Sequence, residues 1–254
     1  MENNLPLLKI KNLTFSRNIK RAYFETVKSI ILKNITFSIN HGQTIGILGE
    51  SGSGKTTLLH LIQGLLAIQK GSIFIDGKNI SEMNLKEHSL LSQIIFQNVG
   101  SCFNPRYTVK EILEEPIIIH KLNNNNNSII NEALDLVKIS NEMFKKRPKD
   151  LSGGQLQRIN IARALMLKPK LLLCDEIVSA LDLSIQAQVL NTLNDIQKIK
   201  KMSIIFVSHD INVINHMSDY IYVLKDGVIY DEFDDLHNSN NLKPFTLKLI
   251  SNSF

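Results

Sequence analysis

Residues 49–56 carry the residue types that phosphate binding requires. They read Gly-Glu-Ser-Gly-Ser-Gly-Lys-Thr and match the pattern G-x-x-x-x-G-K-[ST]. Glycines let the backbone wrap closely, so that its N–H groups point at phosphate oxygens, and the start of a helix adds a favourable dipole. Lys55 supplies positive charge for the β- and γ-phosphates, and the Thr56 hydroxyl is a ligand for Mg²⁺. The segment predicts a nucleotide-phosphate site formed by Gly49, Glu50, Ser51, Gly52, Ser53, Gly54, Lys55, Thr56 and Thr57.

Two acids, Asp175 and Glu176, directly follow the apolar residues 171–174. As the end of a parallel strand, this position is where α/β sheets bind their ligands. Asp175 is then placed to hold Mg²⁺ directly or through water, as in other phosphate-loop enzymes. Glu176 is free to orient and polarise an attacking water. The pair therefore predicts hydrolysis, with Asp175 as metal ligand and Glu176 as catalytic carboxylate.

A second glycine turn, Ser152-Gly153-Gly154-Gln155, precedes a helical pattern. The backbone N–H groups at a helix start form a second anion site in the same chain. Two such sites suggest that the turn of one molecule faces phosphates held by the loop of another. By itself, however, a Ser-Gly-Gly turn is more often a plain helix cap.

Gln97 and His209 each follow a predicted strand, at residues 93–96 and 203–207. Polar side chains at such strand ends can reach the γ-phosphate or its water. A lone Gln or His is more often structural or solvated. A catalytic role for these two residues is therefore indicated only because the glycine loop and the two acids are present in the same chain. Both are candidate catalytic residues.

Buried strands alternate with helices along much of the chain, which predicts an α/β fold with a parallel sheet covered on both faces. Apolar patterns predict strands near residues 8–15 and 32–39, joined by a basic loop at 17–29, and a further strand pair near 71–76 and 93–96. Residues 109–146 are expected to be helical, with a flexible loop at the asparagine run 123–127. The remaining elements are helices at 55–66, 155–166, 185–199 and 211–216 and strands at 44–48, 171–174, 203–207, 220–224 and 228–230.

The composition is that of one globular domain. The 254 residues include 29 Lys and Arg against 24 Asp and Glu, so the net charge is +5, and 43% of the residues are hydrophobic. This balance excludes wholesale disorder and is too weakly basic to predict a nucleic-acid partner. No apolar run approaches the roughly 20 residues that span a bilayer, and the polar start does not resemble a secretory signal. Two cysteines, Cys102 and Cys174, are too few for a disulfide scaffold, and a soluble chain in a reducing cytosol is expected.

Together these motifs resemble the ATP-binding subunit of ATP-binding-cassette (ABC) transporters, from about residue 7 to residue 250. The most specific element is Leu-Ser-Gly-Gly-Gln at 151–155, which other phosphate-loop families lack. The resemblance implies an α/β P-loop NTPase cassette with a mixed β-sheet core. It also implies a single domain at 1–254, with an antiparallel β-subdomain at about 1–40 and an inserted helical subdomain at about 109–160.

The same resemblance assigns roles to single residues. Residues 49–56 are the Walker A loop and 171–175 the Walker B strand, with Glu176 as catalytic carboxylate. Gln97 matches the Q-loop glutamine, which contacts Mg²⁺ and water, and His209 matches the switch histidine. Phe15 matches the aromatic residue that stacks on adenine, with Tyr23 or Phe24 as weaker candidates. The departure is Ile177, where a proline often follows the two acids; it leaves the phosphate contacts intact, so ATPase activity is expected.

The family's architecture implies two ATP molecules, each with Mg²⁺, between head-to-tail subunits. Each ATP lies between one Walker A loop and the signature turn of the opposite subunit, with the D-loop at 179–182 nearby. The residues that contribute from the opposite side are Ser152, Gly153, Gly154, Gln155 and Asp182.

Two segments, 101–109 and 243–250, resemble the branch that serves oligopeptide, dipeptide and nickel importers. This implies hydrolysis of ATP to ADP and phosphate that energises uptake of a nickel or metal chelate, or of oligopeptides. The implied partners are transmembrane permease subunits, a second ATP-binding subunit (a related chain or a second copy) and an extracytoplasmic substrate-binding protein. The implied location is peripheral, at the cytoplasmic face of the inner membrane.

Two other classes of protein share part of this pattern. A non-transport ABC ATPase of the cofactor-assembly type stays open as the alternative function. A small GTPase is disfavoured, because the chain has no Asn-Lys-x-Asp motif for reading guanine.

Overall fold

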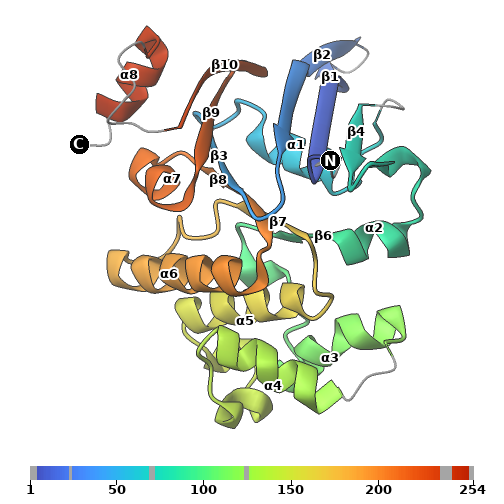
Figure 1. Ribbon diagram of the computed structural model, residues 1–254, viewed down its shortest axis with the longest axis vertical. Coiled ribbons are helices and arrows are strands. Elements are labelled where there is room, and N and C mark those ends of the chain that lie inside the picture. The colour runs from blue at the N-terminus through green and yellow to red at the C-terminus, as the bar shows by residue number, and fades with distance from the viewer. Residues whose placement is uncertain (1–4, 23–24, 69–71, 123–125, 235–241, 252–254) are drawn as a thin grey trace.

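The computed structural model describes the chain except for residues 1–4, 23–24, 69–71, 123–125, 235–241 and 252–254 (Figure 1). Its strands form two sheets. The larger, which we call the core sheet, has the order β10-β9-β3-β8-β7-β6 and is parallel except for β10, which pairs antiparallel with β9. Its strands are β3 (Thr44–Leu48), β6 (Ser92–Ile95), β7 (Leu171–Asp175), β8 (Ser203–Ser208), β9 (Tyr220–Lys225) and β10 (Val228–Phe233).

The smaller sheet is antiparallel and has the order β2-β1-β4-β5. Its strands are β1 (Leu8–Ala22), β2 (Glu25–Ile39), β4 (Ile73–Ile75) and β5 (Lys78–Asn79). The connecting loop expected at 17–29 is wrong, because β1 and β2 stay paired through most of it, with Arg17 opposite Ser29 and Asn18 opposite Lys28. Arg17, Asn18 and Lys28 are exposed. A backbone ladder continues without a buried face, so the end of the apolar pattern does not mark the end of these strands.

The strands expected near 71–76 and 93–96 are present as β4 and β6, but their expected pairing with each other is wrong. β4 pairs with β1 and β5 in the antiparallel sheet, whereas β6 pairs with β7 in the core sheet. Strand patterns predict strands but not partners, since pairing depends on what the intervening chain does.

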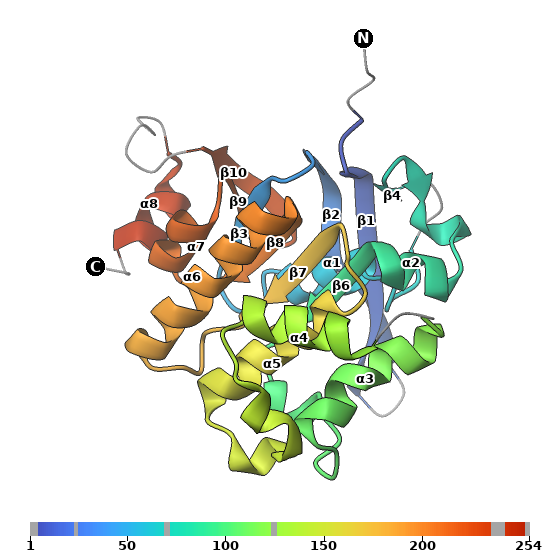
Figure 2. The same ribbon diagram turned by 60° about the horizontal axis from the view of Figure 1, so that its bottom comes forward.

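Helices cover both faces of the core sheet. They are α1 (Lys55–Ile62), α2 (Leu85–Leu91), α3 (Val109–His120), α4 (Asn126–Leu136), α5 (Gly153–Leu165), α6 (Leu183–Lys200), α7 (Ile211–Met217) and α8 (Pro244–Ser251). Figures 1 and 2 show α3, α4 and α5 grouped on one side of the core sheet, opposite the antiparallel sheet. The asparagine run lies partly outside the described residues, and Asn126 already begins α4.

Alternate residues of one strand enter different hydrophobic clusters. In β7, Leu172 and Cys174 pack with the helices α3–α7, while Leu171 and Leu173 pack with α1 and the antiparallel sheet. This confirms a parallel sheet buried on both faces. Because its strands are fixed from both sides, the loops at their C-terminal ends have a rigid base. None of the helices in the described part of the chain combines the length and hydropathy of a membrane-spanning segment.

Candidate functional site

The segment 49–56 is a tight loop between β3 and α1. Gly52 and Gly54 have φ angles of +82° and +107°, in the left-handed region, and Gly54 is the N-cap of α1. A Cβ atom at Gly54 would also lie only 2.7 Å from Leu32 Cδ2. The glycine is therefore required by both backbone angle and space. The loop brings the free N–H groups at the start of α1 to the C-terminal edge of the core sheet.

Lys55 lies beneath this loop and is 5% exposed. Its Nζ atom donates to the carbonyls of Gly49 and Glu50, at 2.7 and 2.9 Å, and lies 3.7 Å from Glu176 Oε1. Burial lowers the pKa of Lys55, and the nearby Glu176 and Asp175 carboxyl groups oppose that change. The ammonium group is thus held by carbonyls of its own loop, and phosphate oxygens can take their place as stronger, charged partners.

Thr56 and Asp175 meet beside the loop, where Thr56 Oγ1 donates to Asp175 Oδ1 at 3.1 Å. Burial raises the pKa of Asp175, while the Thr56 hydrogen bond lowers it. A hydroxyl and a carboxylate are the hard oxygen ligands that Mg²⁺ prefers, and a cation here would offset the cost of burying the carboxylate. The described residues contain no group of three or more His, Cys, Asp or Glu side chains fit for a metal. The hydroxyl and the carboxylate together fit an ion whose further ligands include phosphate oxygens and water.

Glu176 is the side chain on which the other candidates converge. Its Oε2 atom accepts from Gln97 Nε2 at 3.3 Å and lies 3.3 Å from His209 Nδ1. Its backbone has φ +47° and its N–H donates to the Val207 carbonyl at 3.0 Å, so the residue turns out of β7 beside the end of β8. The ends of β6, β7 and β8 thus bring Gln97, Glu176 and His209 together, as the parallel order predicts.

A pocket of about 590 Å³ opens beside these residues. It is lined by Thr56, Gln97 and Asp175 together with His60, Phe96 and Asn160, which sequence reasoning missed. Local signals for two of them exist: His60 lies four residues after Thr56 on the same face of α1, and Phe96 directly precedes Gln97. Asn160 on α5 has no comparable signal, because only the packing of α5 brings it here.

The Ser152 turn begins α5. Ser152 Oγ accepts from the Gln155 N–H and Gln155 Oε1 accepts from the Ser152 N–H, at 3.3 and 3.0 Å. Gly154 is buried, and a Cβ atom there would lie 2.4 Å from Ile185 Cγ2, whereas Ser152 and Gly153 are exposed. Within the described residues, no hydrogen bond or ion pair joins this turn to residues 49–56.

Asp182 and Phe15 are positioned by other elements, the start of α6 and strand β1. Asp182 is exposed and caps α6, with Oδ1 accepting from the Ile185 N–H at 3.0 Å. Phe15 is half-buried in β1, opposite Leu32 of β2. The alternatives to Phe15, Tyr23 and Phe24, lie outside the described residues.

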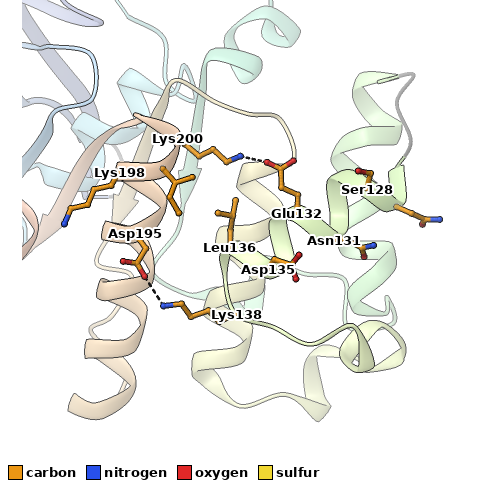
Figure 3. A pocket seen from close by; sticks show the side chains of 11 residues that line it. Ser128, Asn131, Glu132, Asp135, Leu136, Lys138, Asp195, Lys198 and Lys200 are labelled. Carbon is orange, nitrogen blue, oxygen red and sulfur yellow. Dashed lines mark hydrogen bonds and ion pairs between the residues drawn. The ribbon is translucent and has the colours of Figure 1, made fainter.

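A larger groove of about 1120 Å³ lies away from this site, between α4 and α6 (Figure 3). Figure 3 shows Lys200 facing Glu132 and Lys138 facing Asp195 across it. None of the predicted site residues lines it. Two of its acids, Glu132 and Asp195, are already paired with lysines, so we do not assign the nucleotide to this groove.

Comparisons with known proteins agree with this geometry. Residues 32–179 match the family model described as ABC transporter. The chain is 38% identical to the putative oligopeptide transport ATP-binding protein YkfD of Bacillus subtilis (strain 168), over 97% of this chain and 76% of that protein. It is 39% identical to the oligopeptide transport ATP-binding protein OppF of Lactococcus lactis subsp. lactis (strain IL1403), over 89% of this chain and 73% of that protein.

Solved structures give the same result for the fold. The ATP-binding cassette MJ0796, in a dimeric post-hydrolysis state bound to ADP and Pi, superposes with a TM-score of 0.76 at 28% identity, over 89% of this chain and 98% of that chain. The cbiO1 protein from Clostridium perfringens, part of the ABC transporter complex cbiONQ, superposes with a TM-score of 0.79 at 24% identity, over 97% and 93%.

Proposed function

This chain belongs to the ABC transporter family and hydrolyses ATP, and we propose that it is the ATP-binding subunit of an importer for oligopeptides. The convergence of Lys55, Gln97 and His209 on Glu176 beside the glycine loop supports ATP hydrolysis as the step that drives this uptake. The names of the relatives support oligopeptides as cargo. Uptake of a nickel or metal chelate is the competing cargo.

In the proposed mechanism, the loop 49–56 binds the phosphates of ATP. The N–H groups at the start of α1 and the Lys55 ammonium contact the β- and γ-phosphates, Thr57 contacts the α-phosphate, and Phe15 stacks on adenine. Glu176 polarises the attacking water. Gln97 and His209 hold the Glu176 carboxylate in place. Bound Mg²⁺ would neutralise charge on the phosphates, and Thr56, Asp175 and Gln97 are the residues that would hold it.

The other half of the site is proposed to come from a second ATP-binding subunit. Ser152, Gly153 and Asp182 are exposed, and Leu183 beside them is 82% exposed. An exposed helix start with free N–H groups suits a γ-phosphate held by another chain. The similarity to a cassette solved as a dimer with ADP and Pi supports this arrangement. The second subunit is either another copy of this chain or a related chain.

A surface for the permease subunits is proposed where α1, α2 and α3 meet. A pocket of about 420 Å³ is lined there by Leu65, Leu85 and Ile119, which are 55%, 82% and 65% exposed. Exposed apolar side chains gathered around one hollow are typical of a protein interface. We place the chain peripherally at the cytoplasmic face of the inner membrane, with a substrate-binding protein outside. The division into a β-subdomain at about 1–40 and a helical subdomain at about 109–160 stays a prediction.

Ile119→Glu is expected to uncouple the chain from its permease subunits without impairing the nucleotide site. A charge in an apolar interface costs several kcal/mol, enough to remove most of the complex. The matched control is Ile199→Glu, since Ile199 is 64% exposed, almost as much as Ile119, and lies in the groove of Figure 3. Uptake and co-purification should be lost for Ile119→Glu alone, while both purified variants bind MgATP normally. Equal uptake by the two variants would contradict the docking surface.

Affinity purification of the tagged chain from solubilised membranes of the source cells tests the proposed function. We expect two polytopic membrane proteins, together with a second ATP-binding subunit where the pair is made of related chains. Recovery of the chain only in a soluble complex with cofactor-assembly proteins would favour the alternative function and overturn the importer assignment.

A further inference from the structure

The turn between β9 and β10, residues 225–227, touches the glycine loop directly. The Gly227 N–H donates to the Ser53 carbonyl at 3.1 Å, and the Gly227 carbonyl accepts from the Lys33 N–H at 2.8 Å. One residue thus links the loop to the antiparallel sheet. Nothing in the proposed mechanism uses this turn.

The contact at Gly227 has no spare room. Its φ angle is +77°, and a Cβ atom there would lie 2.2 Å from the Ile31 carbonyl oxygen. The nearby Leu224 lies against the start of the loop, because a Cβ atom at Gly49 would lie 2.4 Å from the Leu224 carbonyl oxygen. The end of β9 and the turn after it therefore contact the loop at two points, Leu224 at Gly49 and Gly227 at Ser53.

The hydrogen bond to Ser53 also fixes an N–H direction. The Ser53 carbonyl and the Gly54 N–H belong to one planar trans peptide unit and point in opposite directions. Since Gly227 holds that carbonyl on one side, it aims the Gly54 N–H to the other side, at the start of α1. Aiming backbone N–H groups is what a phosphate loop does.

Residues of α8 contact both strands that flank this turn. The Lys225 ammonium lies 5.1 Å from the ring centre of Tyr230 in β10 and 4.5 Å from that of Phe245 in α8. Asp231 Oδ2 accepts from the Lys243 N–H at 2.9 Å and the Thr246 hydroxyl at 2.8 Å, which ties α8 to β10. The two rings contact each other edge to face, with centres 5.6 Å apart, and an ammonium beside both is a favourable arrangement that fixes the residue next to the turn.

We propose that Gly227 is a positioning residue for ATP, which acts by aiming the glycine loop, and that Lys225, in contact with the rings of Tyr230 and Phe245, keeps the turn in place. The inference rests on the assignment of residues 49–56 as the phosphate loop. A loop aimed wrongly binds phosphates poorly, while Glu176 and its neighbours, which Gly227 does not touch, keep their chemistry. The effect therefore falls on the KM for ATP more than on kcat.

The chain supplies a matched control in the turn Asp76-Gly77. Its φ angles are +53° and +77°, against +48° and +77° in Asp226-Gly227. The nearest atom to a Cβ at Gly77 is Leu5 Cδ1, at 3.8 Å, so Gly77→Ala carries the same backbone strain without the clash. In steady-state kinetics of the full chain, Gly227→Ala should raise the KM for ATP at least about tenfold, with kcat changed less than about threefold. Gly77→Ala should stay within about twofold of wild type for both constants.

A gentler pair of variants decides the question if Gly227→Ala fails to fold. Lys225→Gln removes the charge beside the two rings and should raise the KM for ATP about threefold or more, and Lys225→Arg should restore it. A wild-type KM in folded Gly227→Ala, or in Lys225→Gln, would overturn the inference. Lys55→Ala separates the two failures, because unchanged ATP binding in that variant would overturn the loop assignment itself.

Discussion

Glu176→Gln is expected to slow ATP hydrolysis by a factor of about 100 or more, while MgATP still binds. The Glu176 carboxylate accepts a hydrogen bond from Gln97 and lies beside His209 and Lys55. It is therefore the group placed to take a proton from the attacking water. An amide has the same shape but accepts a proton poorly, and general-base catalysis is worth about 10²- to 10⁴-fold. ATP that binds without being hydrolysed should hold two subunits together.

The measurement combines phosphate release with size-exclusion chromatography in MgATP. Glu132→Gln is the control, because Glu132 is also ion-paired with a lysine, Lys200, but lies in the groove of Figure 3. The control should hydrolyse ATP normally, and only Glu176→Gln should accumulate as an ATP-dependent dimer. Full turnover by Glu176→Gln would contradict the catalytic assignment.

Lys55→Ala is expected to weaken MgATP binding about a hundredfold or more. The Lys55 ammonium is buried and donates its hydrogen bonds to carbonyls of the loop, so it is already positioned for phosphate oxygens. Removing one partner of a buried charge pair costs about 2–5 kcal/mol, and a factor of ten corresponds to about 1.4 kcal/mol. Lys55→Arg should not restore binding, because a planar guanidinium does not fit the place of a compact ammonium group.

Equilibrium binding of a fluorescent ATP analogue provides the measurement. Lys170→Ala is the control, since Lys170 also pairs with an acid, Asp76, at 2.6 Å, but lies outside the loop. Affinity within about twofold of wild type is expected for Lys170→Ala. The same result for Lys55→Ala would show that residues 49–56 do not hold the phosphates.

The candidate site was largely predictable because its parts are local. A glycine loop with Lys55 and Thr56, and an apolar strand that ends in Asp175 and Glu176, each carry their chemistry in a few consecutive residues. The parallel sheet then places these segments next to one another, since it brings the C-terminal ends of its strands to one edge. The roles of the single residues stay predictions, and the structure shows that most of them are close enough to act together.

The parts that sequence reasoning missed depend on tertiary packing. The helices α2 and α8, of 7 and 8 residues, were not predicted from the apolar pattern. Pairing of β1 with β2 beyond the apolar pattern, and the pocket-lining Asn160, follow from contacts between distant segments. The contact of Gly227 with Ser53 is of the same kind, because an Asp-Gly dipeptide predicts a turn but not what the turn touches.

ATP-driven uptake by closed membrane vesicles from the source cells tests the importer assignment most directly. With ATP enclosed on the cytoplasmic side and the substrate-binding protein outside, vesicles with the wild-type chain should accumulate a labelled oligopeptide. Vesicles with equal amounts of Glu176→Gln should not. Labelled nickel chelate serves in parallel as the competing cargo. Equal accumulation of every cargo by the two kinds of vesicle would contradict the claim that ATP hydrolysis at Glu176 of this chain drives uptake.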